Sequence, residues 1–248
     1  MRTRSRGVTL IELLIAVTLL SLLSVGMLMA LRIGLNSMEK ADKKLMANRR
    51  SASTQQILRS QIEGFMPVGV LCRPGMGGPA GAAPVGIPFF DGRPQTLRFV
   101  SSYSLEEASR GEPRVLEFTV IPGDRDQGVR LVVNESLYTG PLSPAATCIG
   151  MAPDPITNRQ VPQFPPVTTG PHSFVLADKL AFCRFSYRHV APEPVLEEWL
   201  ARWTLPEWPT AVRIEMAPLE ADTSRVPLVT ATVPLRVNRV FGMRYASQ

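Results

Sequence analysis

A single carboxylate interrupts the longest apolar run of the chain. Residues 8–31 contain no Lys, Arg, Asp or Pro, and Glu12 is their only ionisable side chain. A carboxylate inside a membrane-spanning helix costs roughly 2.5–3.5 kcal/mol on insertion scales, so it usually marks a functional position. The chemistry open to Glu12 is charge pairing with a cation that would otherwise be buried alone. The alternative is that Glu12, near the helix start, reaches the membrane interface and has no role.

The residues just before this run contain a junction whose cleavage would create a positive charge for Glu12 to pair with. Three arginines occur among the first six residues, and Gly7 and Val8 follow them. An ordinary secretory signal carries its small-residue cleavage site after the apolar core, whereas here the small residue precedes it. Cleavage between Gly7 and Val8 would remove the arginines, keep the apolar helix and create an amino group about one turn from Glu12. In a helical stack, Glu12 of one subunit would then neutralise the amine of the next.

The apolar run is long enough to cross a membrane. Its 24 residues would form a helix about 36 Å long, against a hydrocarbon core of roughly 30 Å. The preceding arginines favour the cytoplasmic side. We therefore expect a single-pass protein of the inner membrane whose remaining residues lie in the periplasm.

Residues 6–16, RGVTLIELLIA, resemble the class III signal of type IV pilins and type II secretion pseudopilins. The resemblance implies that a prepilin peptidase cuts after Gly7 and N-methylates Val8, and that Glu12 serves in filament assembly. The chain departs from the usual pattern at Val8, where Phe is commoner. It also departs at Met29, where many major pilins carry a helix-kinking Pro, and this favours a minor subunit.

The rest of the chain predicts an α+β, pilin-like fold in which one long helix packs on antiparallel sheet. We expect a cleaved leader at residues 1–7, a membrane or filament-core helix at 8–31, its periplasmic continuation at 32–66 and a β-rich globular domain at 67–248. Pro67 ends the helical pattern. The continuation carries one apolar stripe at spacings of three, four and seven, made by Met38, Ala41, Leu45, Ala52, Leu58, Ile62 and Phe65.

Alternating or β-branched segments then follow one another without intervening helices, which favours antiparallel sheet. Predicted strands lie at residues 96–103, 115–121, 129–133, 181–188, 212–216 and 229–237. Two Pro/Gly-rich stretches, residues 67–94 and 140–171, are expected to lack regular structure. Residues 195–203 are expected to form a short helix that carries Trp199 and Trp203. These tryptophans either anchor the helix on the sheet or offer an aromatic partner surface, together with Met38, Leu45 and Ala52.

Three cysteines permit one disulfide and one free thiol outside the cytosol. Cys72 and Cys148 lie in loop-like sequence and form the expected pair. Cys183 lies in an apolar strand pattern and is expected to be a buried thiol. The three show no C-x-x-C spacing, so no metal site of the Cys/His type is expected.

Catalytic and nucleic-acid-binding patterns are absent from the sequence. No nucleophile elbow, P-loop, zincin or dinucleotide motif occurs. The spacing of Asp124, Asp126 and Glu135 fits a calcium-binding loop only in part, because the glycine is misplaced, and a hairpin turn is favoured. The formal charge of +6 falls to +3 without the first three arginines, and the remaining basic residues are scattered. We expect no enzyme activity, no cofactor and no nucleic-acid partner.

A C-terminal stretch, residues 185–235, resembles the J-type minor pseudopilin of type II secretion. The residues that carry this resemblance are Phe185, Tyr187, Trp199, Trp203, Pro209, Ala211, Val212, Val233, Pro234 and Leu235. The resemblance implies a place near the tip of a periplasmic filament, I- and K-type minor pseudopilins as partners, and an inner-membrane secretion platform. Two alternatives stay open: a minor pilin that primes a type IV pilus or DNA-uptake filament, and a membrane-tethered binding or hydrolytic domain.

Overall fold

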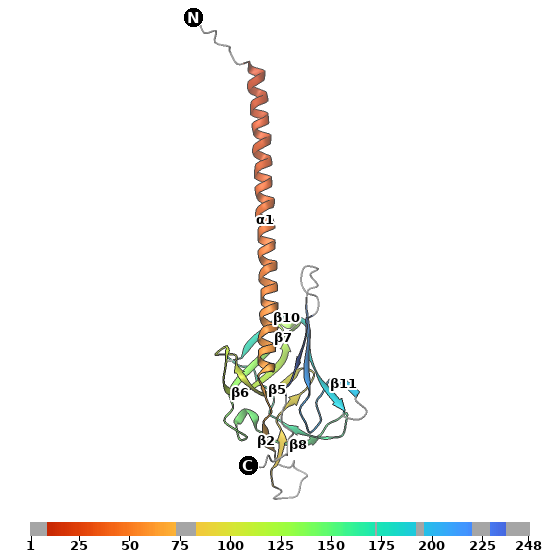
Figure 1. The fold of residues 1–248 in the computed structure, drawn as a ribbon. Coiled ribbons are helices and arrows are strands. Elements are labelled where there is room, and N and C mark those ends of the chain that lie inside the picture. The colour runs from red at the N-terminus through yellow and green to blue at the C-terminus, as the bar shows by residue number, and fades with distance from the viewer. Residues whose placement is uncertain (1–8, 73–82, 172, 192–195, 220–228, 237–248) are drawn as a thin grey trace. The chain divides into compact units, whose positions relative to one another are not determined.

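The computed structural model describes residues 9–72, 83–171, 173–191, 196–219 and 229–236 (Figure 1). The chain divides into two compact units, residues 1–49 and 50–248. Helix α1 (Leu10–Glu63) runs through the boundary, and all the described strands belong to the second unit. The long apolar helix and the antiparallel sheet confirm the predicted α+β, pilin-like fold class.

The helix is continuous because it contains no proline, and it ends earlier than predicted. α1 stops at Glu63, three residues before the expected end at residue 66. A Cβ atom on Gly64 would lie 2.5 Å from Ser101 Oγ, so the chain passes close to strand β5 (Thr96–Ser104) here. The Ser102 amide donates to the Gly64 carbonyl at 2.8 Å, and β1 (Phe65–Met66) pairs with β5. Pairing with the sheet therefore replaces the last helical turn.

The last turns of α1 pack on the sheet of the second unit. Leu58 and Ile62 are fully buried in the main core. Thr54 Oγ1 donates to the Leu176 carbonyl at 2.9 Å, and Ser101 Oγ donates to the Gln61 carbonyl at 2.8 Å. The C-terminal part of the predicted apolar stripe therefore does bind the sheet.

Within the described ranges, nine strands form the main antiparallel sheet. The order along it is β1-β5-β6-β7-β10-β12-β13, with β4 paired to β5 and β11 paired to β10. The remaining strands of this sheet are β4 (Asp91–Gly92), β6 (Ser109–Pro122), β7 (Val129–Leu137), β10 (Phe174–Ala191), β11 (Leu196–Leu200), β12 (Ala211–Pro218) and β13 (Val229–Pro234). All six predicted strand segments lie wholly or largely in these strands, so the prediction of antiparallel sheet is confirmed. Residue 237, the predicted end of the last segment, lies outside the described residues.

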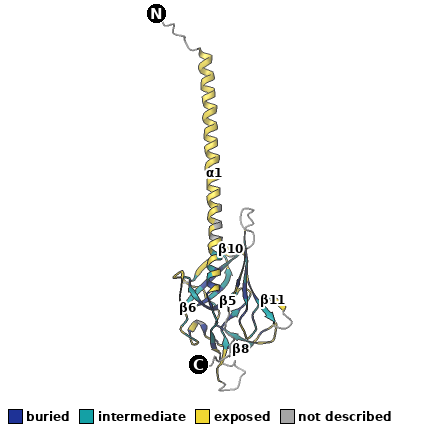
Figure 2. Cartoon of the chain, viewed as in Figure 1, coloured by how far each residue is buried: buried dark blue, intermediate teal, exposed yellow. Residues whose placement is uncertain are grey.

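The alternation of apolar and polar side chains that predicted β10 and β12 corresponds to one buried and one exposed face of these strands. Cys183, Phe185 and Tyr187 are at most 3% exposed, and β12 buries Val212 and Ile214 beside them. The intervening charged side chains face away from this core. Figure 2 shows the resulting distribution, in which buried residues gather in the strands and the first part of α1 is exposed.

The two Pro/Gly-rich stretches are more regular than predicted. β2 (Gly69–Cys72) pairs with β3 (Val85–Pro88), and β8 (Gly150–Pro153) pairs with β9 (Gln160–Gln163), as two separate two-stranded sheets. A short 3-10 turn, η2 (Pro144–Ala146), precedes β8. Each hairpin contains prolines, but a two-stranded ladder leaves one edge of each strand free, and an edge position tolerates a missing N–H.

The predicted helix at residues 195–203 is wrong. Residue 195 lies outside the described residues, residues 196–200 form β11, and residues 201–203 have no regular secondary structure. β11 pairs antiparallel with the end of β10 through Arg188 and Trp199, among others. β10 is 18 residues long and extends past β12, so its free end offers backbone donors and acceptors. Strand pairing satisfies these groups, and this tertiary gain outweighs the local helical pattern.

The turn after β6 is a hairpin connection, as predicted. Pro122 of β6 pairs with Val129 of β7, and η1 (Asp124–Asp126) fills the loop. Asp124 pairs with Arg130, while Glu135 accepts hydrogen bonds from Ser104 Oγ and the Leu105 amide. The carboxylates of Asp124 and Glu135 therefore serve the sheet rather than a common cation.

Candidate functional site

The first candidate site is the start of α1. Gly7 and Val8, the predicted processing junction, lie outside the described residues. Glu12 lies in the first turn of α1 and is exposed. The Leu13 amide donates to the Thr9 carbonyl at 3.2 Å, and the Glu12 amide donates to Thr9 Oγ1 at 3.4 Å. The Glu12 carboxylate has no ion-pair partner among the described residues, so a charge from another molecule can reach it.

The first unit presents a continuous apolar surface. The exposed large apolar side chains between Leu10 and Met46 are all at least 50% exposed. The segment Leu10–Lys43 is long and apolar enough to cross a membrane. Water does not cover so large an apolar surface favourably, so lipid or neighbouring helices must cover it.

The predicted partner residues on α1 are accessible. Met38 is 67% exposed and Leu45 is 50% exposed, and Ala52 is exposed as well. Leu58 and Ile62 continue the same stripe but are fully buried. The stripe is therefore used inside the chain only at its C-terminal end, and its earlier positions remain available.

The two predicted partner tryptophans differ. Trp199 on β11 is half-buried, and the guanidinium carbon of Arg213 lies 3.6 Å from the centre of its ring, a cation–π contact. Trp203 is only 7% exposed, and its indole N–H donates to the Glu207 carbonyl at 2.6 Å. Trp203 is therefore a core anchor and not an exposed partner residue, because its hydrogen bond and its contact with Phe90 hold the ring inside.

Cys72 and Cys148 form a disulfide, with Cα atoms 5.0 Å apart. The bond joins the end of β2 to the residues just before β8, so it ties together the two Pro/Gly-rich stretches. Phe89 and Phe164 pack edge to face beside it, in a second small core. Cys183 is a free buried thiol, and burial raises its pKa to about 12.

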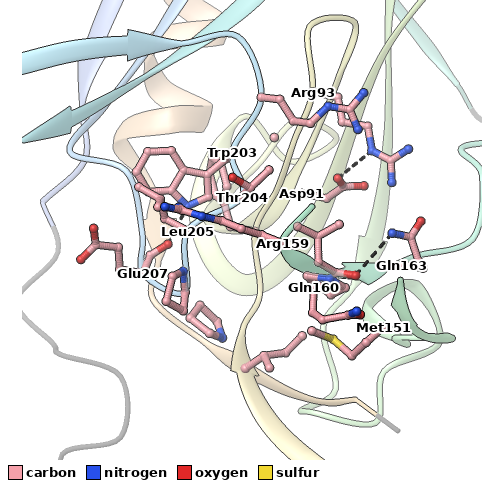
Figure 3. A pocket seen from close by; sticks show the side chains of 18 residues that line it. Asp91, Arg93, Met151, Arg159, Gln160, Gln163, Trp203, Thr204, Leu205 and Glu207 are labelled. Atoms are coloured by element: carbon pink, nitrogen blue, oxygen red, sulfur yellow. Dashed lines mark hydrogen bonds and ion pairs between the residues drawn. The ribbon is translucent and has the colours of Figure 1, made fainter. Parts of the chain in front are cut away.

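The structure also contains a pocket that the sequence did not indicate. It has a volume of about 230 Å³ and lies between the β3–β4 segment, the β8–β9 hairpin and the loop after β11 (Figure 3). Its lining includes Phe90, Arg93, Met151, Arg159, Trp203 and Glu207. No local sequence signal marks it, because the three segments lie far apart in the chain and two were expected to be unstructured.

Metal chemistry has no support in the described part of the chain. No group of three or more His, Cys, Asp and Glu side chains there is arranged to hold a metal ion. Asp154, a buried carboxylate, is bonded to other residues of the chain. The hydrogen bond from the Thr157 amide, followed by those from the Ile156 amide and the Thr157 hydroxyl, holds the pKa of Asp154 below its usual value. Arg202 Nη1 lies 3.2 Å from Asp154 Oδ2.

Comparison with known families identifies the start of the chain. Residues 2–28 match the family model described as the prokaryotic N-terminal methylation motif. A comparison with curated proteins found no match. The motif implies processing by a prepilin peptidase and association with a membrane, and α1 supplies the apolar helix that such a motif precedes. Together the motif, the helix and the fold support a place for this chain in the type IV pilin-like class of membrane-anchored proteins.

Proposed function

We propose that this chain is a J-type minor pseudopilin, an assembly subunit near the tip of the type II secretion filament. The observation that carries the proposal is the arrangement of the residues that resemble that family. They fall mainly on β10, β11, β12 and β13, which are neighbours in one sheet: Arg188 pairs with Trp199, Phe185 with Ile214, and Val212 with Val233. Residues scattered over 51 positions of sequence thus form one structural unit.

The role of Glu12 in this proposal is electrostatic. After cleavage, the new amine of Val8 would be a cation in an apolar filament core, where an unpaired charge is costly. Glu12 is exposed and carries no ion pair among the described residues, so it can pair with the amine of a neighbouring subunit. Breaking such a buried pair by removing one partner typically costs about 3–5 kcal/mol. The pair would therefore favour the one register of neighbouring helices in which both charges are neutralised.

The remaining parts of the proposal concern location and partners. The helix would anchor the chain in the inner membrane with the β-rich unit in the periplasm. I- and K-type minor pseudopilins would bind the accessible residues of α1, including Met38 and Leu45, and the surface near Trp199. The inner-membrane secretion platform would extend the filament, and the chain itself would catalyse no reaction.

A binding experiment between purified periplasmic fragments tests this proposal. The fragment from residue 36 onward should be retained by immobilised I- and K-type fragments. Leu45→Asp should weaken retention at least ~10-fold, because it places a charge in an apolar contact. Arg110→Gln, an exposed change on β6, is the matched control and should have no effect. Binding to the minor pilins of a type IV pilus, with none to the I- and K-type fragments, would overturn the J-type assignment.

A further inference from the structure

The pocket beside β9 has a charge imbalance that the residues described by the structure do not satisfy. Arg93 Nε lies 2.9 Å from Asp91 Oδ1, and Arg202 is paired with Asp154. Glu207 Oε1 lies 3.3 Å from His189 Nε2. Arg159 lines the same pocket, yet its guanidinium has no ion pair or hydrogen bond with any residue that the structure describes. Figure 3 shows the Arg159 side chain extended into the pocket.

Arg93 adds further donors on the same wall. Only its Nε is bonded to Asp91, and the side chain is 37% exposed, so its terminal N–H groups remain available. The planar donor fork of an arginine matches carboxylate and phosphate groups, and the carboxylates of Asp and Glu are the common anions of a protein surface. Arg159 is therefore the guanidinium with which an incoming negative charge can pair, and Arg93 adds positive charge to the same lining.

The rest of the wall is apolar or carries amides. Phe90, Met151 and Trp203 contribute apolar surface, and Gln160 and Gln163 contribute amide groups. A carboxylate with an apolar neighbour, joined by a backbone that uses amide hydrogen bonds, fits this lining. β9 pairs only with β8, so a segment lying beside it meets an unpaired strand edge within the described residues.

The volume of the pocket favours one or two side chains of a partner over a large cofactor. Small-molecule and cofactor sites usually occupy about 300–1,000 Å³. The pocket holds about 230 Å³, which is too small for a dinucleotide or a haem and suits one or two side chains. The hydrogen bond from the Trp203 indole to the Glu207 carbonyl, at 2.6 Å, joins two of the lining residues and holds that wall in place.

We propose that this pocket binds a short acidic segment of a partner protein, seating one carboxylate on Arg159 and the adjacent apolar side chain against Phe90 and Met151. The site uses none of the residues assigned to membrane insertion or to the Glu12 pair. Failure of peptide binding would therefore leave the filament role standing, and failure of the filament role would leave the pocket.

The test uses the full-length chain in detergent with methyl-labelled methionine, and the Met151 signal, assigned with Met151→Leu, reports on the pocket. The probes are a capped hexapeptide with Glu next to Leu and the same peptide with Gln in place of Glu. The acidic peptide should shift the Met151 signal saturably and bind about tenfold more tightly than the Gln peptide. Arg159→Gln should abolish that preference, and the exposed Arg110→Gln should retain it.

Three results would overturn the proposal. One is the absence of a saturable shift at peptide concentrations up to ~10 mM. Another is equal affinity for the two peptides. The third is an unchanged preference in Arg159→Gln, whose methionine spectrum first shows that the variant is folded.

Discussion

The Tyr187 hydroxyl donates a hydrogen bond of 2.8 Å to the carbonyl oxygen of Arg93. Tyr187 is fully buried on β10, and burial, followed by the nearby charge of Asp91, raises its pKa well above the usual value. The phenol therefore stays protonated and remains a donor at every physiological pH. This bond fixes the segment after β4 where it forms one rim of the pocket.

Tyr187→Phe should lower the free energy of unfolding by about 1–2 kcal/mol, because it removes the donor of a part-buried carbonyl. Thermal or denaturant unfolding of the variant measures the loss. Tyr103→Phe is the matched control: its hydroxyl donates to the Ala108 carbonyl at 2.9 Å, but this bond is exposed to solvent. Its change should stay within about 0.5 kcal/mol. Equal losses in the two variants would contradict the anchoring role of Tyr187.

Loss of the disulfide should destabilise the β-rich unit by roughly 2–4 kcal/mol. The two cysteines are 76 residues apart, so the bond removes much loop entropy from the unfolded chain. The measurement compares denaturant unfolding of the oxidised protein with that of the double variant Cys72→Ser, Cys148→Ser. A reducing agent should destabilise the parent protein and leave the double variant unchanged. Three free thiols in the untreated protein would show that the bond does not form.

Cys183 should resist alkylation in the folded protein. Its pKa is raised to about 12 because burial disfavours the thiolate, which is the reactive form. At neutral pH the thiolate fraction is therefore very small, and the side chain is only 3% exposed. Iodoacetamide followed by mass spectrometry should label Cys183 slowly in buffer and fast in denaturant. Fast labelling of the folded protein would be incompatible with the burial of this thiol.

The sequence predicted best where one physical pattern acted alone. Strict alternation in Cys183, Phe185 and Tyr187 predicted a strand with one buried face, because only one side of the sheet faces the core. The apolar run around Glu12 predicted the helix, since no proline or glycine pair interrupts it. These signals are local, so a single segment contains all the information needed.

It predicted worst where long-range pairing decides the structure. β2, β3, β8 and β9 lie in proline- and glycine-rich sequence and become strands through their hairpin partners, and the disulfide links the two hairpins. β11 became a strand because the end of β10 required a partner. The pocket could not be predicted from the sequence for the same reason. Arg93, Arg159 and Trp203 line one pocket only after these strand pairings form.

Glu12→Ala should leave membrane insertion intact, since removal of a charge favours insertion. It should reduce incorporation of the chain into the filament at least ~10-fold, because the amine of the neighbouring subunit would lose its partner. Membrane fractionation and secretion by a strain that carries only the variant measure the two effects. Glu12→Asp, which keeps the charge, is the matched control and should retain most activity. Secretion at the parental level in Glu12→Ala would end the charge-pairing mechanism.

The mature N-terminus decides whether the chain keeps its apolar helix after processing, as a filament subunit must. Mass spectrometry of the N-terminal peptide of the mature protein identifies that terminus. We expect a peptide that begins at Val8 and carries an N-methyl group, and a protein that keeps the residues before Val8 in a strain without prepilin peptidase. A mature terminus beyond Leu31, with the helix removed as an ordinary signal, would rule out the filament role.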